Sequence, residues 1–149
     1  EEVPIVGAKA AGVKAINLKK DDVLATAFIA NTDSLYILTQ RGALKRMAVA
    51  DIPVTSRANR GLQVLRDLKS KPHRVFQAGP VFGEQPAELD LFSSDNPAAE
   101  EEQILSIVSS KGTTYEVNLS DLALSERTSN GSFISDTISD EEVFSANLK

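Results

Sequence analysis

The sequence predicts an all-β fold of repeated, propeller-like units. Residues 35–68 align with residues 105–138 at a shift of 70 positions, and six residues are identical between the two copies. Each copy joins two apolar runs at a glycine, which is typical of a hairpin. No segment shows convincing helical periodicity over ten or more residues. Such units stack on one another because a single unit cannot bury its apolar face alone. The identical residues, followed by their partners, are Leu35, Ile37, Gly42, Asp51, Arg57, Gly61 and Leu105, Ile107, Gly112, Asp121, Arg127, Gly131.

The hairpins come first in each copy. In residues 34–52 an apolar run ends at Gly42, and Gly112 is the matching residue of the second copy. A tight hairpin needs a residue that tolerates positive φ there, which glycine does without a steric cost. Side chains alternate along a strand, and Met47 and Val49 match apolar residues in the other copy. Parity therefore predicts that odd positions face inward and that Arg46 faces outward.

Two further strands follow each hairpin. We predict them at 61–68 and 74–78, and at 131–138 and 142–146 in the second copy. The start of the chain shows only this second half of a unit, at 12–18 and 23–28. Four strands per unit is typical of propeller blades. The chain is thus predicted to be a single partial disc of about two and a half to three blades, with blade-like units over 1–33, 34–79 and 103–149.

An acidic insertion interrupts the pattern at 79–102. It contains seven Asp and Glu, three Pro and no Lys or Arg. A solvated surface insertion is the simpler interpretation of a long polar loop. The alternative is an acidic flap that competes with a polyanion for a basic rim.

Charge divides the chain into two halves. Residues 1–78 carry thirteen Lys and Arg against seven Asp and Glu, a net charge of +6. Residues 79–149 carry three against fourteen, a net charge of −11. This separation predicts that one half meets a polyanion while the other stays solvated or repels it.

Composition excludes several classes of protein. The 149 residues contain no Cys, which removes disulfides and thiolate metal sites. No apolar run approaches the roughly 20 residues of a membrane helix, and no secretory signal is seen, so we expect a cytoplasmic protein. The single histidine, His73, makes no metal site by itself. No nucleophile with its base and no phosphate-loop motif occurs, so we expect neither a catalytic residue nor a cofactor or metal in this chain. Because the chain opens at Glu1 with half a unit, we expect it to be part of something longer.

The candidate binding residues form a basic strip. Arg57 and Arg60 precede Gly61 in an expected exposed loop, where guanidinium groups can bond phosphates bidentately. Arg57 recurs as Arg127, so this position is either architectural or a phosphate contact, whereas Arg60 does not recur. Ordinary solvated residues paired with local carboxylates remain the alternative for each. The candidate DNA-binding residues are Lys14, Arg41, Lys45, Arg46, Arg57, Arg60, Arg66, Lys69, Lys71 and Arg74.

Three stretches carry a family resemblance. Gly-Val-Lys-Ala-Ile-Asn-Leu at 12–18, Leu-Tyr-Ile-Leu-Thr-Gln-Arg-Gly-Ala-Leu-Lys-Arg at 35–46 and Ser-Arg-Ala-Asn-Arg-Gly-Leu-Gln-Val-Leu at 56–65 resemble the C-terminal domain of the A subunits of bacterial type II topoisomerases. The topoisomerase IV branch is the closer one. The Gln-Arg-Arg-Gly-Gly-Lys-Gly box of gyrase is not matched by Gln-Arg-Gly-Ala-Leu-Lys-Arg at 40–46.

The resemblance implies a β-pinwheel, a propeller-like disc whose blades exchange strands and whose basic perimeter binds and bends duplex DNA without reading its sequence. It implies a non-catalytic module that presents DNA to a separate breakage and reunion core for supercoil relaxation and decatenation. ATP, Mg²⁺, a B subunit and a second A subunit are implied for the parent enzyme at the bacterial nucleoid, not for this chain. The alternative is a protein-binding propeller scaffold that uses its acidic face.

Overall fold

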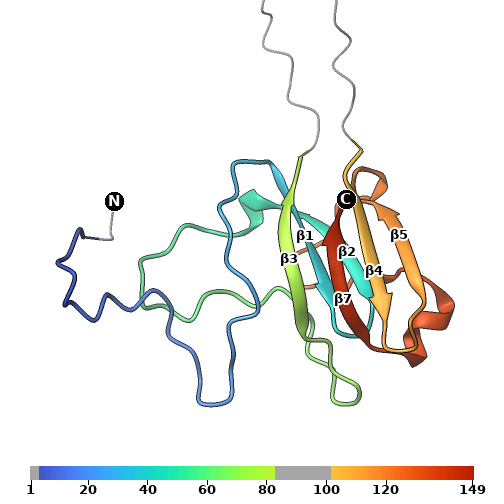
Figure 1. The fold of residues 1–149 in the computed structure, drawn as a ribbon, viewed down its shortest axis with the longest axis horizontal. Helices are drawn as coiled ribbons and strands as arrows, with labels where there is room; N and C mark the ends of the chain where they lie inside the picture. The colour runs from blue at the N-terminus through green and yellow to red at the C-terminus, as the bar shows by residue number, and fades with distance from the viewer. Residues whose placement is uncertain (1–3, 83–101) are drawn as a thin grey trace, which may run out of the picture.

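The computed structural model describes residues 4–82 and 102–149, and its regular structure is all β (Figure 1). Two antiparallel sheets pack together, and the only helices in the described residues are short 3₁₀ turns. The strands are β1 (Ser34–Thr39), β2 (Ala43–Ala48), β3 (Val75–Val81), β4 (Ile104–Ser109), β5 (Thr114–Asn118), β6 (Ser132–Phe133) and β7 (Val143–Leu148). The 3₁₀ turns are η1 (Val49–Asp51), η2 (Leu119–Asp121) and η3 (Asp136–Asp140).

The two sheets are built to one plan. The first has the strand order β3-β1-β2-β6 and the second has the order β5-β4-β7. In each sheet the third long strand carries one extra residue at the same place, opposite Leu38/Thr39 in one and Val108/Ser109 in the other. The predicted all-β repeat is therefore confirmed.

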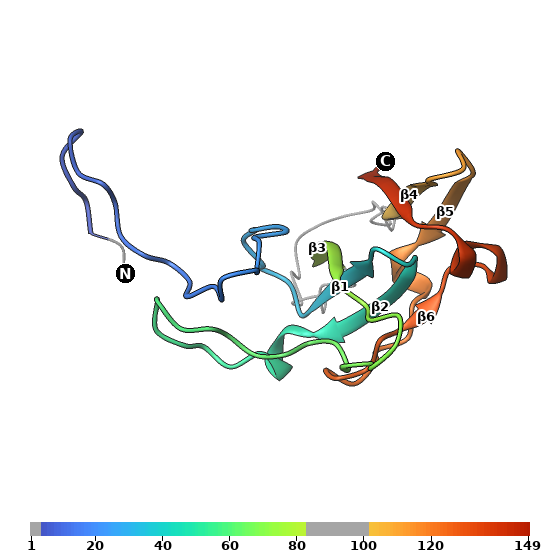
Figure 2. The same ribbon diagram turned by 90° about the horizontal axis from the view of Figure 1, so that it is seen from below.

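One strand crosses from the second repeat to the first. β6 pairs with β2, with Phe133 opposite Ala43 and Ser132 opposite Leu44 (Figure 2). The first sheet thereby reaches four strands, whereas no fourth strand pairs with β5 in the described residues. The β-pinwheel architecture is present, and the exchange of strands between its units is visible in this pair.

The repeated glycines form the turns that their positions predict. Gly42 has φ 76° and Gly112 has φ 84°, each closing a hairpin through a bond from its amide to the carbonyl of Thr39 or Ser109. Residues other than glycine rarely adopt this region because Cβ approaches the following carbonyl. The two hairpins are thus fixed by the same backbone requirement.

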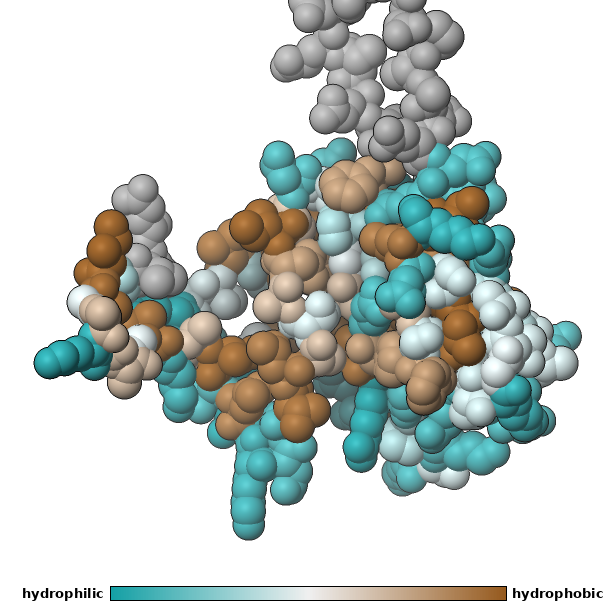
Figure 3. All heavy atoms as spheres, in the orientation of Figure 1, coloured by the Kyte–Doolittle hydropathy of each residue, from teal (hydrophilic) through white to brown (hydrophobic). Residues whose placement is uncertain are grey.

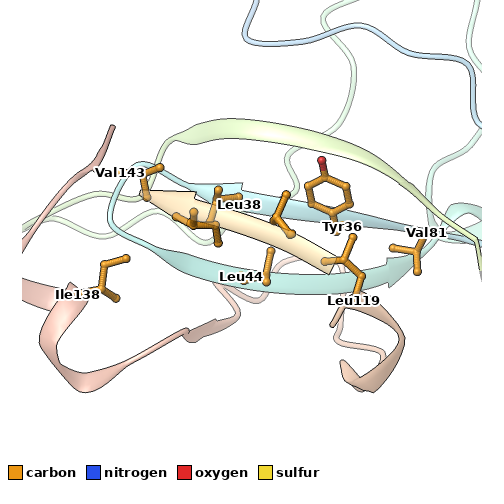
Figure 4. Packing of buried hydrophobic residues seen from close by; sticks show 9 residues of the cluster. Tyr36, Leu38, Leu44, Val81, Leu119, Ile138 and Val143 are labelled. Carbon is orange, nitrogen blue, oxygen red and sulfur yellow. The ribbon is translucent and has the colours of Figure 1, made fainter. Parts of the chain in front are cut away.

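The main core lies between the two sheets. Tyr36, Leu38 and Leu44 of the first sheet pack against Leu105, Ile107 and Leu119 of the second repeat (Figure 4). A smaller cluster on the opposite face of the first sheet joins Leu35, Ile37 and Met47 to Leu65. Parity separates the two faces correctly, but the first sheet is covered on both. The prediction that Arg46 faces outward is wrong, because its face of β2 is the one that meets the second repeat.

Several predicted strands do not form. Segments 12–18, 23–28 and 61–68 are extended and mostly exposed, and 131–138 contributes only the two residues of β6 before η3 begins. A single parallel bridge between Ile16 and Asn59 joins these N-terminal segments. A strand forms only where a neighbour accepts its backbone hydrogen bonds. The neighbours that these segments need are not among the described residues. Most of the predicted insertion at 79–102 lies outside the described residues, and its first residues belong to β3.

Candidate nucleic-acid interface

The basic residues of the first half lie mainly on two exposed segments that lead away from the first sheet (Figure 1). These are the N-terminal segment and the link 52–74 between η1 and β3. The exposed members of the predicted set are Lys14, Arg57, Arg60, Arg66, Lys69, Lys71 and Arg74. The structure therefore presents seven of the ten candidates to solvent.

Carboxylates do not neutralise the exposed arginines and lysines of the link. Among the described residues, none of Arg60, Arg66, Lys69, Lys71 and Arg74 makes an ion pair. The predicted alternative, pairing with local carboxylates, is not observed for these five. Their charge stays available to an external anion.

The backbone of the link is held at several points. The amide of Ala58 donates to the carbonyl of Ala15 at 2.8 Å, and the amide of Arg66 donates to Oδ1 of Asn130 at 2.8 Å. Ala58 and Lys71 have positive φ of 63° and 52°, so the chain bends sharply at both. The link is an ordered support for its cations along much of its length.

The hairpin tip of the first sheet holds the end of the link. Gln40 donates from Nε2 to the carbonyl of Pro72 at 2.8 Å. Arg41 donates to the carbonyl of Lys71 at 3.0 Å, and its guanidinium lies 5.3 Å from the ring centre of Phe133. Arg41 is half-buried, so its first task is to position the segment that carries Lys71 and Arg74.

His73 is the centre of this contact, which sequence reasoning missed. Its Nδ1 lies 3.1 Å from Oγ1 of Thr39 and its Nε2 lies 3.2 Å from Nη1 of Arg41. Because the guanidinium only donates, Nε2 accepts and Nδ1 carries the proton. Burial, and then the nearby charge of Arg41, lower the pKa of His73. Thr39 and Arg41 lie more than 30 positions away in sequence, so no local motif announces the contact.

Lys45 is not on the surface. Its side chain sits on the covered face of β2 with 2% exposure, where Nζ donates to the carbonyls of Val64, Arg127 and Ser129. Burial, and then repulsion from Arg127, lower the pKa of Lys45 to about 8. We remove Lys45 from the set of surface contacts because its three donors already bond protein. Its odd position on β2 signalled an inward side chain.

Arg46 is also used within the fold. It donates from Nε to the hydroxyl of Ser34 at 2.8 Å and from Nη1 to the carbonyl of Ser120 at 3.3 Å, so it ties the first sheet to η2. Arg127 donates to the carbonyl of Gln63 at 2.6 Å, which makes an architectural role for this repeated position concrete in the second repeat. The described residues leave the role of Arg57 as a prediction.

A cavity of about 500 Å³ lies where the hairpin tip meets the end of η3. Arg41, Lys71 and Arg74 line one part, and Asp140, Glu141 and Glu142 line another. Opposite charges in one small space favour neither a polyanion nor a polycation strongly. The basic character of the surface therefore depends on the link rather than on this cavity.

Two other kinds of feature are absent from residues 4–82 and 102–149. These residues contain no group of three or more His, Cys, Asp or Glu side chains placed to hold a metal ion. No helix there is both long and apolar enough to cross a membrane.

Comparisons with known proteins agree with this architecture. The family model of the DNA gyrase C-terminal domain, a β-propeller, matches residues 1–31 and 33–81. The chain is 65% identical over 149 residues to the A subunit of DNA topoisomerase 4 from Streptococcus pneumoniae serotype 4, covering 100% of the chain and 18% of that protein. It is 42% identical over 137 residues to the A subunit of DNA topoisomerase 4 from Bacillus subtilis, covering 91% of the chain and 15% of that protein. The chain thus spans less than a fifth of these relatives.

Solved structures show the same fold. The crystal structure of the C-terminal domain of DNA topoisomerase IV matches with a TM-score of 0.76 and 32% identity, over 99% of this chain and 41% of that one. The DNA gyrase A C-terminal domain matches with a TM-score of 0.66 and 16% identity, over 98% and 44%, which supports the fold alone. On these matches and its strand-exchanged sheets, the chain belongs to the DNA gyrase C-terminal domain family, in the branch formed by the A subunits of DNA topoisomerase 4.

Proposed function

We propose that this chain is a non-catalytic module that binds duplex DNA through phosphate contacts from the link 52–74. The observation that carries the proposal is the run of exposed cations without carboxylate partners: Arg60, Arg66, Lys69, Lys71 and Arg74. Such cations bind the phosphate backbone by displacing its counterions and read no base sequence. Arg57 and Lys14 are further proposed contacts, and Arg41 positions the segment that carries two of the others.

We place this module within a longer enzyme. The relatives of which the chain spans 18% are topoisomerase subunits, so we propose a parent type II topoisomerase that uses ATP and Mg²⁺ at sites outside this chain. A B subunit and a second A subunit are its proposed partners, in the bacterial cytoplasm at the nucleoid. The module would bend a DNA segment and present it to the breakage and reunion core.

The test is the anisotropy of a labelled duplex titrated with the chain at several salt concentrations. Each phosphate contact contributes about −0.9 to the slope of log affinity against log salt. The double variant Arg60→Gln/Arg66→Gln should bind more weakly and with a slope shallower by about 1.8. The loss should be equal on duplexes of unrelated sequence, because phosphates carry no sequence information.

A matched control separates local contact from net charge. Lys111→Gln/Lys149→Gln removes the same charge from the second half and leaves a donor beside the paired carboxylates. It should bind DNA much as the parent does. Equal affinities and slopes for the parent and the Arg60/Arg66 variant would remove the link from the interface. A chain that ignores duplex DNA would instead favour the protein scaffold, whose surface would include Glu116, Asp121 and Glu126, all exposed.

A further inference from the structure

The segment between η2 and η3 docks along the free side of β2. Leu124 forms a bridge with Arg46, and the amide of Ser125 donates to the carbonyl of Arg46 at 2.8 Å. Past Gly131, β6 pairs with β2, and the amide of Ile134 donates to the carbonyl of Gly42 at 3.1 Å. The second repeat thus provides a docking segment, 122–134, and the first provides the edge that receives it.

The same segment of the first repeat has no such edge. At the shift of 70 positions, Val54 corresponds to Leu124, and Leu62 and Gln63 correspond to the two residues of β6. Gly61 has φ 78°, close to the 76° of Gly131, so the backbone is already bent for docking. Val54 is nonetheless 102% exposed, and no strand pairing of residues 61–65 occurs in the described chain. Figure 3 shows apolar side chains gathered on this side of the molecule.

The receiving edge of the second repeat is open as well. β5 is the outermost strand of its sheet, and its counterpart β2 is the strand that receives β6. Residues 113, 114 and 116 occupy the positions that Ala43, Leu44 and Arg46 hold in the first repeat. An open strand edge presents unpaired N–H and C=O groups to another chain.

Charge favours contact between this segment and this edge. The segment belongs to the half with net charge +6 and includes Arg57 and Arg60, while the edge belongs to the half with net charge −11 and includes the exposed Glu116. Opposite surfaces of this kind steer association and fix its register. The contact also continues an interface that already exists inside the chain.

We propose that the open edge of β5 binds the segment 52–63 of a second copy of this chain. In the register of the internal exchange, Leu62 lies opposite Thr114 and Val54 lies beside Glu116 of the other copy. The contact is heterologous, with the head of one copy on the tail of the next, so each copy keeps one free segment and one free edge unless a ring closes. This inference stands independently of DNA binding.

The test is sedimentation velocity of the chain over a wide range of concentrations. The parent should change from monomer to dimers and larger assemblies as concentration rises. Val54→Asp/Leu62→Asp should abolish this association by placing two acids against an acidic edge, and Glu116→Lys should weaken it from the other side. A 1:1 mixture of these two variants should form dimers and nothing larger, because only one functional contact is left per pair.

The control is Val23→Asp/Leu24→Asp, which adds two acids at equally exposed apolar positions outside the docking segment. It should associate as the parent does. Circular dichroism and urea unfolding verify that every variant keeps the fold. A parent that stays monomeric, a control that dissociates, or a mixture that forms no dimer would each overturn the proposal.

Discussion

The two repeats hold their hairpin tips with the same contact made from different residues. In the first, His73 bonds Thr39 and Arg41. In the second, the residue before β7 is preceded by Glu141, which accepts from Ser109 and pairs with Lys111 at 3.3 Å. The amides of Gln40 and Ser110 bond the carbonyls of Arg74 and Glu142 in the same way. A neutral imidazole beside a guanidinium has become an ion pair while the backbone stayed the same.

The repeats differ more in what covers them. The first sheet has four strands and is buried on both faces, while the second has three strands and one buried face. Lys45, on the covered face of β2, corresponds to Tyr115 of β5, whose hydroxyl bonds Thr137 near the surface. The same hairpin is thus interior in one place and peripheral in the other, which teaches that burial depends on the neighbour and not on the unit.

The largest expected effect compares two glycines at one repeat position. A Cβ at Gly131 would lie 2.5 Å from the carbonyl oxygen of Leu44, whereas one at Gly61 would meet nothing within 4 Å, although both have positive φ. Gly131→Ala should cost about 3 kcal/mol or more in unfolding free energy, from backbone strain and overpacking together. Gly61→Ala should cost about 1 kcal/mol, the strain alone. Equal losses in urea unfolding would show that the exchange of β6 is not a tight contact.

The second prediction concerns Lys45 and Tyr115. Lys45→Met should lower the unfolding free energy by about 1–3 kcal/mol, because three carbonyls lose their donor in a covered site. The matched change Tyr115→Phe removes one exposed hydroxyl bond and should cost less than about 1 kcal/mol. Denaturant titration of the two variants measures both costs. A larger loss for Tyr115→Phe would reverse the assignment of interior and periphery.

The smallest effect is a difference in pH response between the two tips. The pKa of His73 is lower in the folded state than its ordinary 6.5, so the unfolded chain binds the proton first and stability should fall as pH drops below about 6.5. The hydrogen bond from Ser109, and then Lys111, lower the pKa of Glu141, so its contribution should be lost only below about pH 4.5.

Unfolding at a series of pH values measures both steps. His73→Gln should flatten the first step and leave the second unchanged, and Glu141→Gln should do the reverse. A first step that survives His73→Gln would mean that another group titrates there.

Sequence reasoning succeeded where the constraint was local. Gly42 and Gly112 marked the hairpins because positive φ is a property of one residue, and the odd positions of β2 were correctly placed on one face. It failed at 12–18 and 61–68, where strand-forming residues have no partner to accept their backbone bonds. It also assigned Lys45 and Arg46 to a surface because charge suggested exposure, while buried carbonyls distant in sequence satisfy both.

The sequence by itself determined that this protein is built from repeated β hairpins with a basic first half and an acidic second half. Only the tertiary structure decided that β6 completes the sheet of the other repeat, that Lys45 is enclosed, and that Arg60 and Arg66 are free of ion pairs. The physical reason is that turn geometry and alternation act within a few residues. Pairing and burial instead depend on which edge or face the fold brings alongside.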